Sequence, residues 1–156
     1  EYVANPSFET NKVGWTGLYN TQTTTSRVTV NTYDGKYSLK VLRKVTAAGA
    51  AGAVSKPSPV PSTTAGADFN GSVWVHGQKA GQSQTVVLQI NEVNAAGTVV
   101  GTSSANVVFS DTAWHQLTVP YTTVGAKNHL DIAIYSPDLK GKAWFLADLV
   151  SLVGPA

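Results

Sequence analysis

Short runs in which apolar and polar residues alternate recur along the chain. They lie at residues 27–30, 37–41, 72–76, 86–91, 98–100, 114–119, 130–135 and 144–153. A period of two residues predicts β-strands with one buried face, and no segment shows sustained helical periodicity. Eight or so short strands without helices between them predict an all-β fold, an antiparallel β-sandwich of two sheets.

The segment 46–66 breaks this alternation because it is rich in Ala, Gly, Pro and Ser. Its three prolines, Pro57, Pro59 and Pro61, restrict any strand there to a sheet edge or a short piece. No internal repeat and no linker divides the chain, and 156 residues fit one domain. We therefore expect residues 1–156 to form a single sandwich domain.

The alternation also sorts side chains between two faces. Aliphatic residues alternate with aromatic or polar ones in the runs 72–76, 86–91 and 130–135. A strand with one buried face places its aliphatic set inside. The opposite set then faces outward and comprises Trp74, His76, Gln89, Asn91 and Tyr135. If these strands share a sheet, its outer surface combines aromatic plates with amides and an imidazole.

Such a surface suits a sugar. A flat indole or phenol covers the apolar C–H face of a pyranose ring, and amides donate to and accept from its hydroxyl groups. Trp74 beside Gln89 and Asn91 would meet both requirements. A structural role stays open for the tryptophans: Trp15 and Trp144 fit either the core or the rim of a cleft, and Trp114 is expected in the core.

The amino-acid composition limits the kinds of partner that the chain can bind. Only 13% of residues are charged and the formal net charge is +2, so short neutral polar groups cover the surface. The chain has only two arginines, Arg27 and Arg43, which disfavours nucleic-acid binding. No apolar stretch is long enough for a membrane span. Cysteine is absent, which excludes disulfides and thiolate metal sites. The first and last residues resemble cut points in a longer, secreted polypeptide.

Catalytic chemistry is missing from the pattern. A glycosidase needs two placed carboxylates, but the three Glu and six Asp form no evident pair on one strand face. No G-x-S-x-G nucleophile motif occurs, and the three histidines lack metal-ligand spacing. We therefore expect a non-catalytic domain rather than an enzyme.

Four motifs occur in the order of a known family. They are NPSFE at residues 5–9 with Gly14-Trp15, GKYSLKV at 35–41, WHQLTV at 114–119 and FLADLVSL at 145–152. This ordered set resembles the jelly-roll carbohydrate-binding modules of the family 4, 9, 16 and 22 type, which share the galactose-binding-like sandwich. The resemblance covers nearly the whole chain.

The resemblance implies a structural calcium ion between the first and last strands. Glu9 and Asp148 match the acidic ligands, and the backbone carbonyls near Asn11 and Lys36 match the remaining positions. Calcium prefers several oxygen ligands, so carboxylates from both chain ends would tie the sandwich together. The alternative is that Glu9 and Asp148 only form hydrogen bonds in turns.

The resemblance also implies where a ligand binds. Trp74, Gln89, Asn91 and Tyr135 match the concave sheet, whereas Trp15, Tyr19 and Trp144 match the rim; His76 lies on the same predicted face as Trp74. The segment 46–66 lacks the aromatic residue expected in cellulose- and xylan-binding members.

The resulting hypothesis is a monomeric carbohydrate-binding module that attaches a parent polysaccharide-degrading enzyme to a neutral, β-glucan-like polysaccharide or oligosaccharide. Its partners are this glycan and the catalytic domain of the same polypeptide. The first alternative is a structural or adhesion sandwich that packs against a neighbouring domain or protein. The second is a small glycan-active enzyme, which would need a pair of carboxylates on the outer face.

Overall fold

The computed structural model describes residues 1–19 and 21–156. These residues form ten β-strands and no helix, so none of the described segments is an apolar helix able to cross a membrane. The strands are β1 (Trp15–Leu18), β2 (Thr23–Val28), β3 (Ser38–Arg43), β4 (Gly49–Ser55), β5 (Asp68–Gly77), β6 (Gln84–Val93), β7 (Val99–Phe109), β8 (Trp114–Thr122), β9 (His129–Leu139) and β10 (Trp144–Val153).

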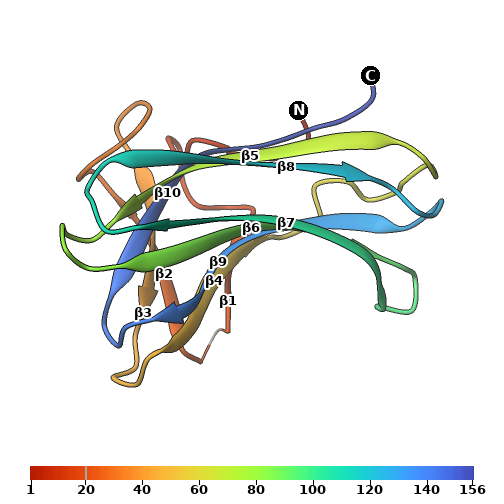
Figure 1. The fold of residues 1–156 in the computed structure, drawn as a ribbon. Coiled ribbons are helices and arrows are strands. Elements are labelled where there is room, and N and C mark those ends of the chain that lie inside the picture. The colour runs from red at the N-terminus through yellow and green to blue at the C-terminus, as the bar shows by residue number, and fades with distance from the viewer. Residues whose placement is uncertain (20) are drawn as a thin grey trace.

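The strands form two five-stranded antiparallel sheets packed face to face (Figure 1). Sheet A has the order β1-β4-β9-β6-β7, and sheet B has the order β2-β3-β10-β5-β8. Of the nine connections between consecutive described strands, seven cross from one sheet to the other, and only β2–β3 and β6–β7 stay within a sheet. The predicted all-β sandwich with a jelly-roll arrangement is confirmed.

The alternation of the central strands correctly predicts the core. Val73 and Val75 of β5 are fully buried, as are Leu88 and Ile90 of β6 and the aliphatic residues of β9. They meet between the sheets in one continuous hydrophobic cluster. Because each such side chain contributes roughly 1.5–3 kcal/mol when it leaves water, this cluster fixes which face of every central strand points inward.

β4 differs from the prediction. The segment 46–66 contains a seven-residue strand that lies inside sheet A, paired with both β1 and β9, rather than at an edge. The strand ends at Ser55, before the first proline, so the prolines do not interrupt the ladder. Its small residues have a packing reason: a Cβ atom on Gly52 would lie 2.5 Å from the Cβ of Tyr135 on β9.

A polar contact crosses the sandwich at one end. Glu92 of β6 is fully buried, and its carboxylate accepts a hydrogen bond from the Tyr121 hydroxyl of β8, in the other sheet (2.7 Å). Val124 N–H, Gly125 N–H and the Asn128 side-chain amide also donate to it. Burial raises the pKa of Glu92, but these four donors outweigh it and leave the pKa below its usual value.

Candidate functional site

The outer face of sheet A carries a groove of about 270 Å³. Four strands contribute to it, and its lining mixes aromatic, amide, aliphatic and charged side chains. The lining residues are Leu18, Tyr19, Val54, Lys56, Gln89, Asn91, Asp131, Ala133 and Tyr135. The structure therefore brings together four of the predicted ligand residues: Tyr19, Gln89, Asn91 and Tyr135.

Strand register explains the hollow shape. Val54 of β4 pairs with Ala133 of β9, which pairs with Gln89 of β6. The short side chains of Val54 and Ala133 form the floor of the groove. Tyr135 and Asp131 stand on the same face of β9, two residues to either side of Ala133. At strand spacing, these flanks are roughly 13 Å apart. The groove therefore runs across the strands, and the small side chain of Ala133 leaves it open at its centre.

A chain of hydrogen bonds orders the polar side of the groove. The Tyr135 hydroxyl donates to Gln89 Oε1 (2.9 Å), and Gln89 Nε2 donates to Asn91 Oδ1 (2.7 Å). Thr102 of β7 donates to the same Asn91 oxygen (2.8 Å). Within the described residues the Asn91 amide N–H₂ has no acceptor, so the chain ends in two donors available to a ligand.

Tyr19 and Tyr135 supply the aromatic surface of the groove. Tyr19 follows β1 in the left-handed region (φ 53°), and 48% of its surface is exposed. Burial, together with the nearby Tyr19, raises the pKa of Tyr135, so its hydroxyl stays a neutral donor at neutral pH. One open and one half-buried phenol thus lie along the same groove.

The opposite flank is charged. Asp131 accepts a hydrogen bond from the Ser58 hydroxyl and pairs with Lys56 Nζ at 3.4 Å. His129 Nε2 lies 3.9 Å from the same carboxylate. Sequence reasoning missed these residues, although Asp131 shares the outward parity of Tyr135. Ser58 and Lys56 carried no signal, because only the fold brings the segment after β4 alongside β9.

The position predicted for Trp74 needs correction. β5 lies in sheet B, so Trp74 and the Gln89–Asn91–Tyr135 set occupy opposite faces of the sandwich. Its indole does leave the core, as the parity predicts, but Tyr33 from the loop between β2 and β3 stacks on it (ring centroids 4.0 Å, 14° between planes). Trp74 also lines a hollow of about 280 Å³ beside Ser72 and Gln116, similar in volume to the sheet A groove. A sugar contact at Trp74 stays a prediction.

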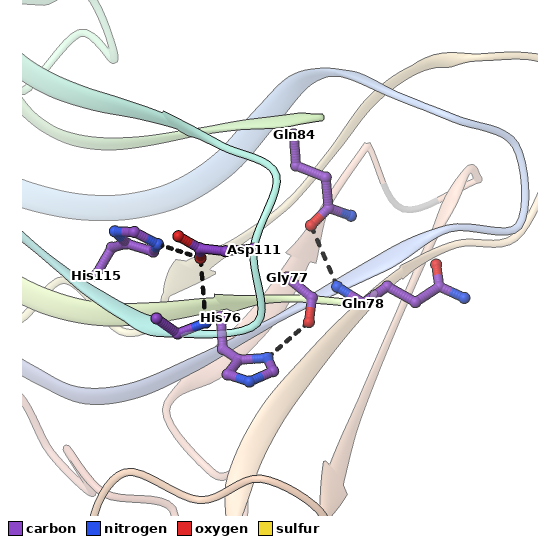
Figure 2. A network of polar contacts seen from close by, with 7 residues as sticks. His76, Gly77, Gln78, Gln84, Asp111 and His115 are labelled. Carbon is purple, nitrogen blue, oxygen red and sulfur yellow. Dashed lines mark hydrogen bonds and ion pairs between the residues drawn. The ribbon is translucent and has the colours of Figure 1, made fainter. Parts of the chain in front are cut away.

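His76 and Trp15 are corrections of a different kind, because both are buried. His76 is only 4% exposed and packs against Trp114, and its Nδ1 lies 2.6 Å from the Gly77 carbonyl (Figure 2). Trp15 is also 4% exposed and packs against Phe8 in the core. Neither ring presents a surface to a ligand. His76 is covered because residues such as Trp114 pack around the end of β5. The alternation of apolar and polar residues does not predict this packing.

Two further tryptophans lie on the outer side of sheet B. Trp144 opens β10, is half-buried and lies under Lys40 Nζ (5.0 Å from the ring centroid), away from the groove. Trp114, expected in the core, pairs with His76 on the outer side and contacts Tyr33 edge-on at 5.8 Å. The predicted rim position of Trp144 is therefore separate from the sheet A groove.

Glu9 and Asp148 meet the same loop from opposite ends of the sequence. Glu9 accepts hydrogen bonds from Lys36 N–H and Tyr37 N–H (2.8–3.0 Å). Asp148 accepts them from Tyr33 N–H and Asp34 N–H (3.0 and 3.1 Å). These bonds hold the loop that places Tyr33 over Trp74.

The fit of a cation to this region can be judged from Asp148. It is fully buried, and burial raises its pKa above the usual value, with the charge of Asp34 acting in the same direction. A buried carboxylate without a cationic partner is the kind of group that a bound cation stabilises. In the described residues no three His, Asp or Glu side chains converge on one point, so backbone carbonyls would supply the other ligands. A calcium ion at this loop therefore stays a prediction.

Comparison with known proteins gives a family match. A family model described as "Carbohydrate binding domain" (families 4 and 9) matches residues 1–141. No curated protein matches the chain.

Solved structures with the same fold are similar at low sequence identity. The CBM22-1 xylan-binding domain of Paenibacillus barcinonensis Xyn10C is 18% identical, with a TM-score of 0.69, over 95% of this chain and 90% of that one. A family 16 carbohydrate-binding module is 20% identical (TM-score 0.64; 98% and 99% covered). The CBM22-1–GH10 modules of Clostridium thermocellum Xyn10B, complexed with xylohexaose, are 19% identical (TM-score 0.72); the match spans 99% of this chain and 28% of that one. These likenesses establish the fold.

Proposed function

This chain belongs to the carbohydrate-binding domain family of modules 4 and 9, and we propose that it binds a neutral glycan chain in the groove on sheet A. It is a non-catalytic carbohydrate-binding module. The observation that carries the proposal is the groove itself, which places two phenols beside a row of amide and hydroxyl groups that are already ordered by hydrogen bonds.

Each part of the groove suits one part of a sugar. The phenols of Tyr19 and Tyr135 offer flat apolar surface to the C–H face of a pyranose. Asn91 offers its free N–H₂ group, and Asp131 offers carboxylate oxygens to ring hydroxyls. Side chains ordered in advance lose little freedom on binding, so each contact contributes more to affinity.

The glycan is proposed to be β-linked and neutral, of the β-glucan or xylan kind. The groove contains one carboxylate and one ammonium group, already paired with each other, so it offers no excess charge to an acidic chain. The xylan-binding descriptions of two similar structures support including xylan among the candidates.

The test is affinity electrophoresis and calorimetry against soluble xylan and mixed-linkage β-glucan. We expect the wild-type protein to be retarded by at least one of these glycans, and Tyr135→Ala to weaken binding about tenfold or more, as loss of a central aromatic contact does. Because Tyr135 is half-buried, Tyr135→Ala should also lower the melting temperature, so affinity is compared at a temperature where the variant is folded. Wild-type migration unaffected by every neutral glycan, or full affinity in Tyr135→Ala, would contradict the proposal.

A structural calcium ion is proposed at the loop between β2 and β3. Glu9 and Asp148 would supply carboxylate oxygens, and the carbonyls near Asn11 and Lys36 the others; bound calcium would supply positive charge to the buried Asp148 and stabilise the folded state. EDTA should then lower the melting temperature, and added calcium should restore it. An identical melt with and without EDTA contradicts the ion.

The module is further proposed to act as part of a larger secreted enzyme. The similarity to a module joined to a GH10 catalytic module supports this arrangement. In it, the domain would keep its catalytic neighbour close to the polysaccharide and raise the effective substrate concentration.

A further inference from the structure

A second hollow lies at one end of the sandwich, apart from the groove. Two connections line it: residues 78–83 between β5 and β6, and residues 140–143 between β9 and β10. Its volume is about 570 Å³, within the range of small-molecule sites. Both connections leave the strands at the left of Figure 1, and Lys140 follows Tyr135 by five residues, roughly 17 Å along a strand.

The walls of this hollow are braced by hydrogen bonds. The Gln78 side chain accepts from Trp144 N–H (3.3 Å), and Gln84 Nε2 donates to the Trp144 carbonyl (2.8 Å). Figure 2 shows Gln78 and Gln84 meeting at the end of β5. On the other wall, Gly141 packs so closely that a Cβ there would lie 1.8 Å from the Thr46 carbonyl oxygen. Both walls therefore have a fixed shape.

All charged residues that line the hollow are positive. Lys79, Lys140 and Lys142 line it, and no carboxylate does. None of the ion pairs found among residues 1–19 and 21–156 includes these lysines. The nearby Arg43, whose N–H bonds the Ala143 carbonyl, buries a guanidinium among neutral oxygens only. Lys142 Nζ also donates to the Lys44 carbonyl, and a concave surface lined by lysines attracts anions.

One wall residue indicates a ligand with hydrogen-bonding groups. Gln82 is only 8% exposed and lines the hollow. Within the described part of the chain its side-chain amide makes no hydrogen bond, although its backbone N–H bonds the Lys79 carbonyl. The amide is therefore accessible from the hollow, and it can donate to and accept from a bound group that carries oxygen atoms.

We propose that this hollow is a second binding site, specific for the carboxylate-bearing sugars (uronates) of an acidic polysaccharide. The lysines would attract the carboxylate, and the Gln82 amide would bond a ring hydroxyl or carboxylate oxygen. Nucleic acid fits less well, because the lining has no aromatic side chain on which a base can stack, and both arginines are bound elsewhere. The site is independent of the groove that binds the neutral glycan.

The experiment is affinity electrophoresis of the whole chain in gels containing polygalacturonate, at low and at high salt. Wild-type protein should be retarded at low salt and released at high salt. Lys79→Ala/Lys140→Ala should bind about tenfold more weakly, as loss of two partly screened charge contacts predicts. Lys12→Ala/Lys127→Ala removes the same charge from exposed positions elsewhere and should bind like the wild type.

Two further variants separate this site from simple charge attraction and from the groove. Gln82→Leu, with net charge unchanged, should also weaken polygalacturonate binding, whereas Tyr135→Ala should leave it intact. Several results would overturn the proposal: no retardation of wild type, equal loss in the Lys12/Lys127 control, full binding by Gln82→Leu, or equal retardation by single-stranded DNA. Neutral-glycan binding by Lys79→Ala/Lys140→Ala should be normal, so failure here is distinguishable from failure of the groove.

Discussion

The outward-facing side chains of the two sheets follow the same alternation, but their surroundings differ. On sheet A, Tyr135 leaves the core and lies in an open groove beside Gln89. On sheet B, Trp74 leaves the core by the same rule, yet Tyr33 stacks directly on it. Alternation therefore shows that a side chain leaves the core, whereas the connecting loops decide whether it meets solvent.

The covering of sheet B has an identifiable cause. Asp148 and Glu9 hold the loop between β2 and β3 through backbone N–H groups on either side of Gly35. This loop carries Tyr33 onto the sheet. Among residues 1–19 and 21–156, no such loop lies over the central strands of sheet A, where the groove is. Trp74 of sheet B is consequently stacked under a loop residue, whereas Tyr135 of sheet A lies in an open groove.

The largest effect that tests this comparison is expected from Trp74→Ala. Removing a stacked, half-buried indole should cost about 3 kcal/mol of unfolding free energy, near the lower end for aromatic-to-alanine changes in cores. Neutral-glycan affinity should be unchanged at temperatures where the variant is folded. Urea denaturation and calorimetry measure the two properties. A stable Trp74→Ala that no longer binds glycan would place the binding site on sheet B instead.

Gly52→Ala should couple stability to binding on sheet A. The new Cβ would lie 2.5 Å from Tyr135 Cβ and 2.8 Å from the Ile134 carbonyl oxygen, so the strand and the phenol must move. We expect a loss of about 1–2 kcal/mol in stability and roughly tenfold in affinity. Gly17→Ala on the neighbouring β1 is the matched control, because its Cβ would meet nothing closer than 3.6 Å. Equal behaviour of the two variants would contradict the coupling.

Tyr33→Ala should have a smaller effect, confined to sheet B. It removes one exposed member of the stack, which is worth about 1 kcal/mol. The tryptophan fluorescence of the chain, to which Trp74 and three other indoles contribute, should become more accessible to a quencher such as acrylamide, while the affinity for neutral glycan stays the same. Unchanged quenching would show that Tyr33 does not cover the indole in solution.

The smallest expected effect is the pH dependence due to Asp148. Its pKa in the folded state is raised above the ordinary 3.8, so in EDTA its contribution to stability is complete below that value and is lost as pH rises through the raised pKa. Melting temperatures across acidic pH should show this slope in wild type and not in Asp148→Asn. Bound calcium should reverse the slope, because it favours the ionised carboxylate in the folded state. A slope that Asp148→Asn retains in EDTA would assign it to another group.

The sequence was sufficient to predict the buried face of each central strand. The β-branched and aliphatic residues of β5, β6 and β9 lie in the core as their spacing predicts. It was insufficient to predict which strands are neighbours, because β5 and β6 follow each other in sequence but lie in different sheets. The error for Trp74 arose there. β4 was underestimated for a related reason: small residues, weak as a strand signal, are needed beside Tyr135.

The candidate site divides in the same way. Gln89, Asn91 and Tyr135 were predicted because they are outward-facing residues of long strands with clear alternation. The Lys56–Asp131 pair and the hollow around Gln82 depend on loops that approach each other only in the folded chain. Local sequence patterns therefore predict which face of a strand a residue occupies, but they do not predict contacts between loops.

Glu92 has a consequence for how the two layers can move. Its buried carboxylate on β6 accepts a hydrogen bond from the Tyr121 hydroxyl of the opposite sheet and three more from Val124, Gly125 and Asn128. If one sheet slid past the other by a single side-chain step, this buried anion would lose its donor from the opposite sheet. A purely apolar core would tolerate several relative positions of the two sheets. The buried Glu92 carboxylate favours one of them, and so helps to preserve the shape of the groove on sheet A.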